Sequence, residues 1–268
     1  MSAVVGTGRT STGGTTTPAG RMRALAQAEF TLFRRNKGML VTALLVPLVL
    51  PFSVQSATKD MDLKEAGLSI GTVMLPASVG FSLLFAVYAG LVGVYTARRE
   101  ELVLKRLRTG ELRDVEILTG AALPAATTGF VQSVLLAIGC AVMLDLDAPS
   151  APQLAVIGLL LGLATCVALA ALTAALSRTT ESAQVTSLPL MLVSFLGSGI
   201  TVPLEVLPDR VASFCELLPL TPAITLVRGA WTGDLSAYEV LGAVLTGLAW
   251  TVLSVFAVRR WFRWEPRH

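Results

Sequence analysis

Charged residues are scarce in this sequence, at 15% of 268 residues, whereas soluble globular domains carry about 25%. Hydrophobic residues make up 53% of the chain, so the composition indicates an integral membrane protein. The single histidine is His268, which argues against histidine-dependent catalysis and histidine-ligated metals. Only three cysteines are present, and Cys140 and Cys166 lie inside apolar runs, so neither a disulfide framework nor a cysteine metal site is expected.

Phosphate-binding and zinc-binding motifs are also missing. The sequence has no GxxxxGK[ST] loop, no GxGxxG after a strand and no HExxH, so we expect neither nucleotide hydrolysis nor a cofactor bound by this chain. No Asp, Glu, Lys or Arg interrupts its long apolar runs. A charge at the bilayer centre costs about 2.5–3.5 kcal/mol and is kept for function, so a proton- or sodium-coupled carrier is disfavoured.

The apolar runs themselves predict an all-α integral membrane protein, since about 20 residues suffice for a helix to cross a bilayer. Residues 1–20 are rich in Gly, Ser, Thr and Pro, so we expect a disordered tail that is not a secretory signal peptide, followed by one transmembrane domain from 21 to 268. Small-residue spacings such as Gly158 and Gly162 favour close helix contacts. We predict six transmembrane helices, at about 39–58, 72–97, 117–144, 153–177, 184–204 and 240–258.

The distribution of basic residues predicts the orientation of these helices. Of the 21 Lys and Arg residues, 17 fall on one side: six before the first span, six in the loop 98–116, Arg178, and four after the last span. Basic loops stay in the cytoplasm, so both termini are expected there. The net charge of +3 is explained by these loops, and no nucleic-acid partner is expected.

The segment from Arg21 to Lys37 resembles an interfacial helix. Met22, Leu25, Ala26, Phe30 and Phe33 fall near one face, while arginines at both ends can reach lipid headgroups. The alternative is an ordinary positively charged flank of the first span.

The loop from Arg98 to Glu116 is the one long charged segment between spans. Its pattern predicts a short helix with acidic residues in the first turn, basic residues in the last and Gly110 as the C-terminal cap. Leu104 and Leu107 make a small apolar face suited to docking. A solvated loop is the alternative. The residues expected at the docking surface are Glu100, Glu101, Leu104, Lys105, Arg106, Leu107 and Arg108.

The segment 203–239 lies on the far side by topology but is largely apolar. Val211, Phe214 and Leu218 share one helical face, as do Ile224, Val227 and Trp231, and Pro208 and Pro222 stand where each helix would start. We predict two short re-entrant helices in the outer leaflet, because a polar loop would not expose this much apolar surface.

Four stretches together give the chain a family likeness. It resembles the membrane permease subunit of ABC-2 type ABC transporters of the bacterial drug-export sort. The stretches are EFTLFRRNKGMLVTALLVPLVLPF at 29–52, ARREELVLKRLRTGELRDVEIL at 97–118, SGITVPLEVLPDRV at 198–211 and LLPLTPAITLVRG at 217–229. Two departures concern the loop, where Leu102 replaces the usual Gly and Gly110 the usual Pro.

The resemblance implies that the loop helix is a coupling helix seated in a separate ABC ATPase subunit, which holds ATP and Mg²⁺. It also implies a second permease copy, most simply as a homodimer, with an amphipathic small-molecule substrate exported between the two copies, as in antibiotic resistance. Aromatic residues of spans 2 and 5 would then line the path: Phe81, Phe85, Tyr88, Tyr95 and Phe195.

Three alternatives stay open. The five aromatic residues can be ordinary packing groups. The exported compound can be a polysaccharide or lipid-linked glycan, although aromatics are only 6% of the chain. A membrane-integral lipid-modifying enzyme would need an acidic or histidine cluster, and the nearest acidic pair, Asp145 and Asp147, indicates a turn.

Overall fold

The computed structural model describes residues 69–109, 112–262 and 264, together with seven separate residues between 20 and 37. The first predicted span, the outer loop 59–65 that follows from the predicted orientation, and Gly110 lie outside the described residues. Each of the seven separate residues is helical, and the Thr31 hydroxyl donates to the Gln27 carbonyl over 2.8 Å. The interfacial helix expected at 21–37 stays a prediction.

The described chain is entirely helical, with no strand in residues 69–109 and 112–262. The first described element along the chain is one long helical rod. It is made of α3 (Ile70–Phe81), a π-helical segment η1 (Ser82–Ala89) and α4 (Gly90–Glu100). The remaining elements are α5 (Val103–Arg108), α6 (Asp114–Met143), α7 (Pro152–Leu176), α8 (Thr180–Gly197), η2 (Leu204–Val206), α9 (Asp209–Cys215), α10 (Thr221–Thr232) and α11 (Ala237–Trp261).

Four of the described helices are long and apolar enough to cross a membrane: Ile70–Glu100, Asp114–Met143, Pro152–Leu176 and Ala237–Trp261. These helices coincide closely with the predicted spans 72–97, 117–144, 153–177 and 240–258, and the total of six spans stays a prediction. The predicted span 184–204 is wrong at its end, because α8 stops at Gly197 and Gly199 takes a φ of +73° in the turn that follows. At 18 residues, α8 is about 27 Å long.

Reciprocal caps explain where three of the helices begin. In each, a Ser or Thr hydroxyl accepts from the backbone N–H three residues on, whose side chain accepts from the backbone N–H of the capping residue. These caps satisfy backbone groups that a helix leaves free, worth about 0.5–2 kcal/mol each. The three pairs are Ser69 with Thr72, Thr179 with Ser182, and Ser236 with Glu239.

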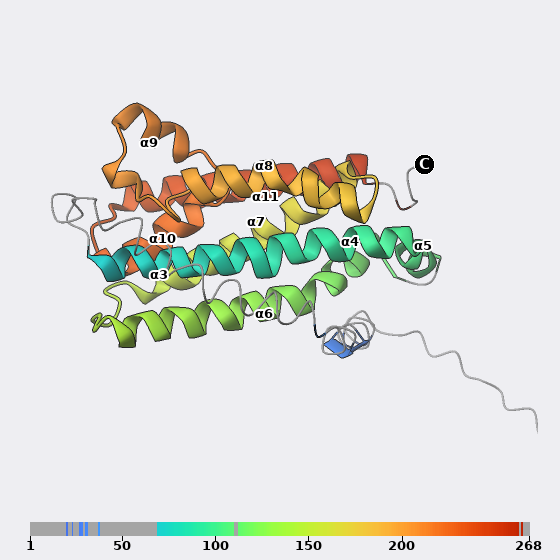
Figure 1. Ribbon diagram of the computed structural model, residues 1–268, viewed down its shortest axis with the longest axis horizontal. Helices are drawn as coiled ribbons and strands as arrows, with labels where there is room; N and C mark the ends of the chain where they lie inside the picture. The colour runs from blue at the N-terminus through green and yellow to red at the C-terminus, as the bar shows by residue number, and fades with distance from the viewer. Residues whose placement is uncertain are drawn as a thin grey trace, which may run out of the picture.

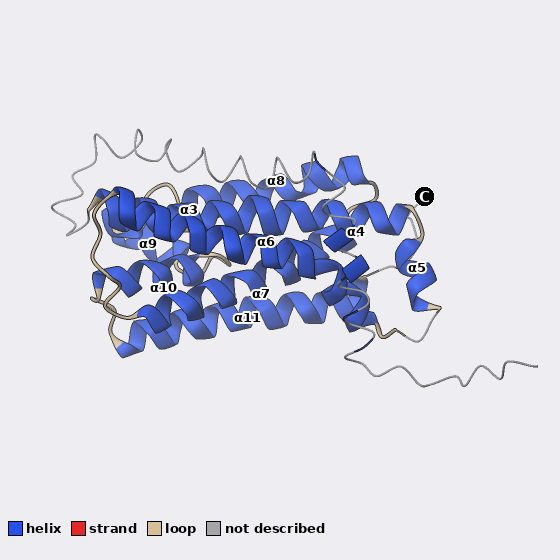
Figure 2. Cartoon of the chain, turned by 90° about the horizontal axis from the view of Figure 1, so that it is seen from below, coloured by secondary structure: helices blue, strands red, loops and turns tan. Residues whose placement is uncertain are grey.

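The long helices lie side by side along the longest axis of the molecule (Figure 1). α5 lies at one end of the molecule, with the last turns of α11, and α9 and α10 lie at the other end; a view turned by 90° shows the same arrangement (Figure 2). We refer to these as the α5 end and the α9 end. The rod α3–η1–α4 carries the largest share of the buried core, packed against α6, α7, α8 and α10.

α7 and α10 approach each other closely at the predicted small residues. A Cβ atom on Gly158 would lie 2.9 Å from the Ala223 carbonyl oxygen, and one on Gly162 would lie 2.9 Å from the Cβ atom of the same alanine in α10. Such distances leave no room for a larger residue without displacing backbone. Gly158 and Gly162 thus let α10 seat directly on α7.

The two short helices predicted after span 5 are present, and each starts at its proline. Pro208 precedes α9, and Pro222 lies in the first turn of α10. Their surroundings differ: Val227 and Ile224 of α10 are buried, whereas Phe214 of α9 is 69% exposed. α10 is therefore part of the core, and placement in the outer leaflet stays a prediction.

Candidate functional site

The charged segment at the α5 end is divided between two helices. α4 continues to Glu100, Glu101 caps it, and Leu102 turns the chain with φ +58° before α5 begins at Val103. The expectation that Glu100 and Glu101 form the first turn of the loop helix is therefore wrong. A left-handed conformation is unfavourable for Leu by about 1–2 kcal/mol, and it occurs at the position where the family pattern has Gly.

The two leucines of α5 are not equally available to a partner. Leu104 is fully buried within this chain, between α4 and α6, and Leu107 is half-buried. Leu104 seats the helix on its own chain and is not free to insert elsewhere. The exposed surface of this turn and helix instead combines Leu102, 40% exposed, with Glu101, Lys105, Arg106 and Arg108.

Arg108 links α5 to its neighbours at the surface. Its Nε donates to Asp114 Oδ1 over 3.0 Å, and its guanidinium lies 5.0 Å from the centre of the Trp264 ring. Asp114 is the first residue of α6, where a negative charge also suits the positive end of the helix dipole. Because the ion pair is half-exposed, its contribution is about 0–1 kcal/mol.

Arg99 joins the end of α4 to the end of α7. Its side chain is fully buried, and its two terminal nitrogens donate to the carbonyls of Ala174 and Ser177 over 2.7 Å and of Arg178 over 3.2 Å. These carbonyls belong to the last turn of α7 and the residues just beyond, which lack helical partners and carry the negative end of the dipole. Carbonyl groups at the C-terminus of α7 thus take the place of water around the buried Arg99 guanidinium.

Glu100 binds the next residues along the same link. Its carboxylate accepts from the backbone N–H of Thr180 over 3.1 Å and from the Thr180 hydroxyl. Thr180 is the first residue of α8. Arg99 and Glu100 together fasten α4 to the link between α7 and α8, and only the two-residue turn 101–102 separates this clamp from α5.

The clamp was not anticipated from the sequence, where Arg99 fell in the charged loop 98–116 and Glu100 was expected in the first turn of the docking helix. A signal was nevertheless present. Tyr88, Val92, Tyr95 and Arg99 recur at spacings of three and four, so Arg99 continues the buried face of the helix.

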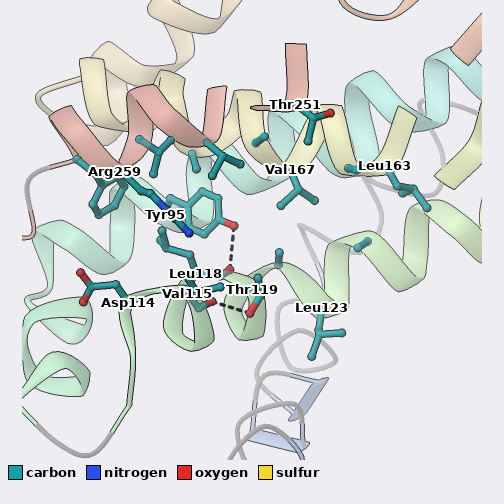
Figure 3. Close-up of a pocket in the computed structure, with 18 of the residues that line it drawn as sticks. Tyr95, Asp114, Val115, Leu118, Thr119, Leu123, Leu163, Val167, Thr251 and Arg259 are labelled. Carbon is teal, nitrogen blue, oxygen red and sulfur yellow. Dashed lines mark hydrogen bonds between the residues drawn. The ribbon is translucent and has the colours of Figure 1, made fainter. Parts of the chain in front are cut away.

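A cavity of about 520 Å³ lies beside this clamp, between α4, α6, α7 and α11 (Figure 3). Most of its lining is apolar, including Leu118, Leu163 and Val167. Its hydroxyl groups are engaged within the chain: Tyr95 donates to the Leu118 carbonyl over 2.9 Å, and Thr119 donates to the Val115 carbonyl over 2.6 Å.

One charged group at the edge of this cavity remains available. Arg259 of α11 is exposed and has no hydrogen bond or ion pair with the residues that the structure describes. The cavity therefore suits an apolar body with an acceptor or anionic group near Arg259.

Four of the five aromatic residues proposed for the translocation path pack away from this cavity. Phe81 and Tyr88 are fully buried, and Phe81 contacts Phe85 and Phe195 at ring distances of 6.4 and 5.4 Å. Tyr95 is buried and contributes its hydroxyl to the cavity wall. This arrangement agrees with packing inside one chain, and a path along these residues stays a prediction.

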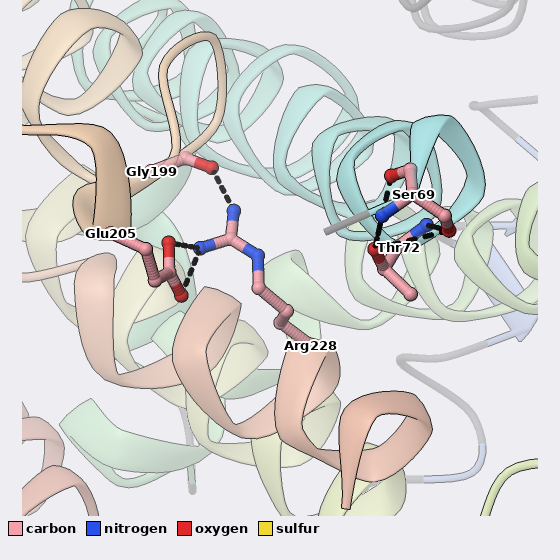
Figure 4. Close-up of polar contacts among 5 residues, drawn as sticks. All are labelled: Ser69, Thr72, Gly199, Glu205 and Arg228. Atoms are coloured by element: carbon pink, nitrogen blue, oxygen red, sulfur yellow. Dashed lines mark hydrogen bonds and ion pairs between the residues drawn. The ribbon is translucent and has the colours of Figure 1, made fainter. Parts of the chain in front are cut away.

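A second buried arginine organises the α9 end (Figure 4). Arg228 of α10, 3% exposed, donates through Nη1 to both carboxylate oxygens of Glu205, over 3.1 and 2.9 Å, and through Nη2 to the Gly199 carbonyl over 2.7 Å. The ion pair thus spans the two stretches 198–211 and 217–229 that were singled out in the sequence. Sequence reasoning counted Arg228 only as an outward basic residue and missed its partner.

Metal ligands do not gather in the described part of the chain, where no group of three or more His, Cys, Asp or Glu residues could hold an ion. A family model described as ABC-2 type transporter matches residues 21–231. No curated protein matched the chain in a sequence comparison.

Proposed function

The chain belongs to the ABC-2 type transporter family, and from this membership we propose that it is the permease subunit of an ATP-driven exporter of amphipathic or lipophilic small molecules. The family places it among the membrane components of ABC transporters, which work with an ABC ATPase. Export, the drug-like substrate, pairing with a second copy and cytoplasmic termini are the proposed parts. ATP and Mg²⁺ would be held by the partner, and this chain would carry no cofactor.

The observation that carries the proposal is the connection between α5 and the clamp. A partner that moves α5 acts across the turn 101–102 on α4, which Arg99 and Glu100 fasten to the ends of α7 and α8. Force applied at α5 would therefore reach three long helices through short, charge-assisted hydrogen bonds. Such a device fits a chain in which no motif for nucleotide hydrolysis is found.

Leu102 replaces Leu104 as the proposed anchor for the ATPase. An exposed apolar side chain surrounded by Glu101, Lys105 and Arg106 has the composition of a small interface: an apolar centre with a charged rim. Leu107, half-buried, would extend this centre.

Copurification with the ATPase tests the docking surface. Leu102→Asp should reduce the amount of bound ATPase about tenfold or more, because a buried interface anchor is worth roughly 2 kcal/mol. Arg113→Ala, an exposed position just beyond the loop helix, should leave binding within about twofold. Normal ATPase binding by a well-expressed Leu102→Asp chain would refute docking at this surface and direct attention to the segment 21–37.

Cysteine labelling tests the orientation. In a background lacking Cys140, Cys166 and Cys215, Glu101→Cys should be protected from an impermeant maleimide added outside intact cells, and Asp209→Cys should be labelled. The reverse pattern would overturn the proposed topology.

The cavity at the α5 end supports an amphipathic substrate over a glycan. Its walls are apolar, and its Tyr95 and Thr119 hydroxyls already donate within the chain, so few groups remain to bind a polyhydroxylated sugar. A glycan permease is the second candidate, and loss of lipid-linked glycan export in a deletion strain would favour it.

A further inference from the structure

Residues 201–219, which we call the α9 segment, run between α8 and α10 and carry η2 and α9. Both ends of the segment are fixed in the core, because Ile200 just before it and Leu220 just after it are fully buried. The helix between these ends is largely exposed: within α9 only Cys215 is buried, and Phe214 is 69% exposed. Figure 1 shows α9 arching away from the long helices. The α9 segment is therefore a strap that is attached firmly at its two ends and contacts the bundle little in between.

The underside of the α9 segment rests on the last turn of α8. A Cβ atom on Gly197, the last residue of α8, would lie 2.6 Å from Leu218 Cδ1 and 3.4 Å from Cys215 Sγ. The Cys215 carbonyl also accepts from the hydroxyl of Thr221, the first residue of α10, over 2.6 Å. Lifting the segment off Gly197 would uncover the Cys215 thiol, which is buried in this structure.

Two long side chains from α10 and α11 hold the α9 segment against the bundle. Arg228 donates to both carboxylate oxygens of Glu205, over 3.1 and 2.9 Å (Figure 4). Trp250 donates through Nε1 to the Leu217 carbonyl over 2.8 Å. Because the Glu205 side chain is half-exposed, water and salt compete with Arg228 for its carboxylate. The ion pair thus stabilises the closed arrangement only modestly.

Polar atoms beside the ion pair destabilise the closed arrangement. Arg228 Nε and Ser198 Oγ are shielded from water and have no hydrogen bond to the residues that the structure describes. Ser198 directly precedes Gly199, whose carbonyl accepts from Arg228 Nη2. A buried donor without a partner carries its full desolvation cost, and water would remove that cost once the segment lifted. Closure therefore depends on a small balance between the contacts of the α9 segment and these two unsatisfied groups.

We propose that the α9 segment is a lid over the last turn of α8, and that the Glu205–Arg228 ion pair determines how often the lid is shut. In the open form Glu205 separates from Arg228 and Cys215 leaves Gly197, while the buried residues at both ends of the segment stay in place as hinges. The long helices do not move, and the open form is a minor population. The lid is a property of this chain alone, and only its position on the exit side of the membrane rests on the proposed function.

The reactivity of Cys215 measures the open form. The full chain is placed in phosphatidylcholine nanodiscs and treated with N-ethylmaleimide, a neutral reagent, and modification of each cysteine is followed by mass spectrometry of its peptide. We expect Cys215 to react at least about tenfold more slowly than a cysteine introduced by Ser213→Cys at an exposed position of α9. Cys166, fully buried in α7, reports on opening of the whole bundle. No ATPase is present, so failure here leaves docking on α5 unaffected.

Glu205→Gln removes the ion pair while keeping the size of the side chain. Modification of Cys215 should become about tenfold faster, because the open form gains population, and the rate at Cys166 should stay unchanged. Glu216→Gln is the matched control. It removes the same charge next to Cys215 from an exposed residue outside the ion pair, so the rate should change by less than about twofold.

Salt provides a second measurement, made on the wild-type chain. Raising NaCl from about 0.05 to about 1 M should speed the modification of Cys215 about threefold, because screening weakens the ion pair. The same change should have no effect on the rate in Glu205→Gln.

Three results would overturn the proposal. Modification of Cys215 as fast as at Ser213→Cys would mean that no lid covers the thiol. Equal rates for the wild type and Glu205→Gln, or equal acceleration by Glu216→Gln, would remove the role of the ion pair. Faster modification of Cys166 together with Cys215 would indicate loosening of the whole bundle instead of a lid.

Discussion

The two ends of the molecule each contain a buried arginine, but different groups solvate the two side chains. At the α5 end, Arg99 donates to carbonyls at the C-terminus of α7. At the α9 end, Arg228 binds the carboxylate of Glu205, which is 43% exposed, and one carbonyl of the turn at Gly199. The first arrangement joins helix to helix, whereas the second holds a loop on a helix with a partner that water can reach.

This difference indicates which end of the molecule can open locally and which end can move only together with several helices. Residues around Arg99 are enclosed by long helices, so a change there must be shared among α4, α7 and α8. Residues around Glu205 lie in a segment of short elements, η2 and α9, that can open locally. The α5 end is therefore suited to transmitting movement and the α9 end to local opening.

Arg99→Met should have the largest effect. It leaves the carbonyls of Ala174 and Ser177 buried without their donor, so we expect the free energy of unfolding to fall by about 2–6 kcal/mol, roughly 1–3 kcal/mol for each carbonyl. The midpoint of thermal aggregation in detergent measures this loss. Arg260→Met, at an exposed position on α11, should shift the midpoint little. Similar shifts for both variants would mean that the clamp does not stabilise the helices.

Disrupting the ion pair at the α9 end should lower the free energy of unfolding less than Arg99→Met does. Arg228→Met leaves a carboxylate that water can solvate, so we expect a loss of about 1–3 kcal/mol, confined to the outer segment. Hydrogen exchange should accelerate in residues 198–210 and stay unchanged in α4 and α7. Faster exchange throughout the chain would show that both ends respond alike, against the comparison drawn above.

Relief of strain at Leu102 is a smaller effect of opposite sign. Leu102→Gly should raise the free energy of unfolding by about 0.5–1 kcal/mol, because glycine adopts the left-handed conformation without penalty, less its greater entropy in the unfolded chain. The same variant should weaken ATPase binding, since the apolar side chain is lost. Increased stability with undiminished binding would remove Leu102 from the docking surface. At the α9 end, two of the positive-φ positions are already glycines, Gly199 and Gly233, and the third is Asp145, a residue type that tolerates the left-handed conformation better than Leu, so a smaller gain is expected there.

Arg108→Ala should have the smallest effect. Its ion pair with Asp114 is half-exposed, and its contact with Trp264 adds about 0.5–1 kcal/mol at such a site. We expect a stability change below about 1.5 kcal/mol that shrinks in high salt, measured by the same thermal assay at two ionic strengths. A larger, salt-independent loss would indicate that α5 depends on Arg108 more than on Leu104.

The long apolar helices were predictable because hydrophobic length alone identifies them, and the short helices α9 and α10 because prolines precede their apolar stripes. The residues at which helices end were harder to predict from the sequence. α8 ends at Gly197 because the chain turns towards Glu205, and this turn depends on Arg228, some 30 residues later in the sequence. Such a contact leaves no local pattern.

The candidate site was predicted in location more than in detail. The charged segment 98–116 does contain a short helix, but composition could not tell that Leu104 packs inward or that Leu102 faces outward. Both are leucines near charges, and only the left-handed turn at Leu102 decides which one is exposed. The cavity depends on how four helices meet, which no single helix encodes.

The π-helical segment η1 has a consequence for how this rod can change in length during evolution. A π turn closes its hydrogen bonds one residue later than an α turn, so it absorbs an additional residue while leaving the helices on both sides in phase. An insertion or deletion elsewhere between Ile70 and Glu100 would rotate everything beyond it by about 100° and turn Arg99 away from α7. Residues 82–89 are thus the segment from which a single residue can be lost while the clamp is kept.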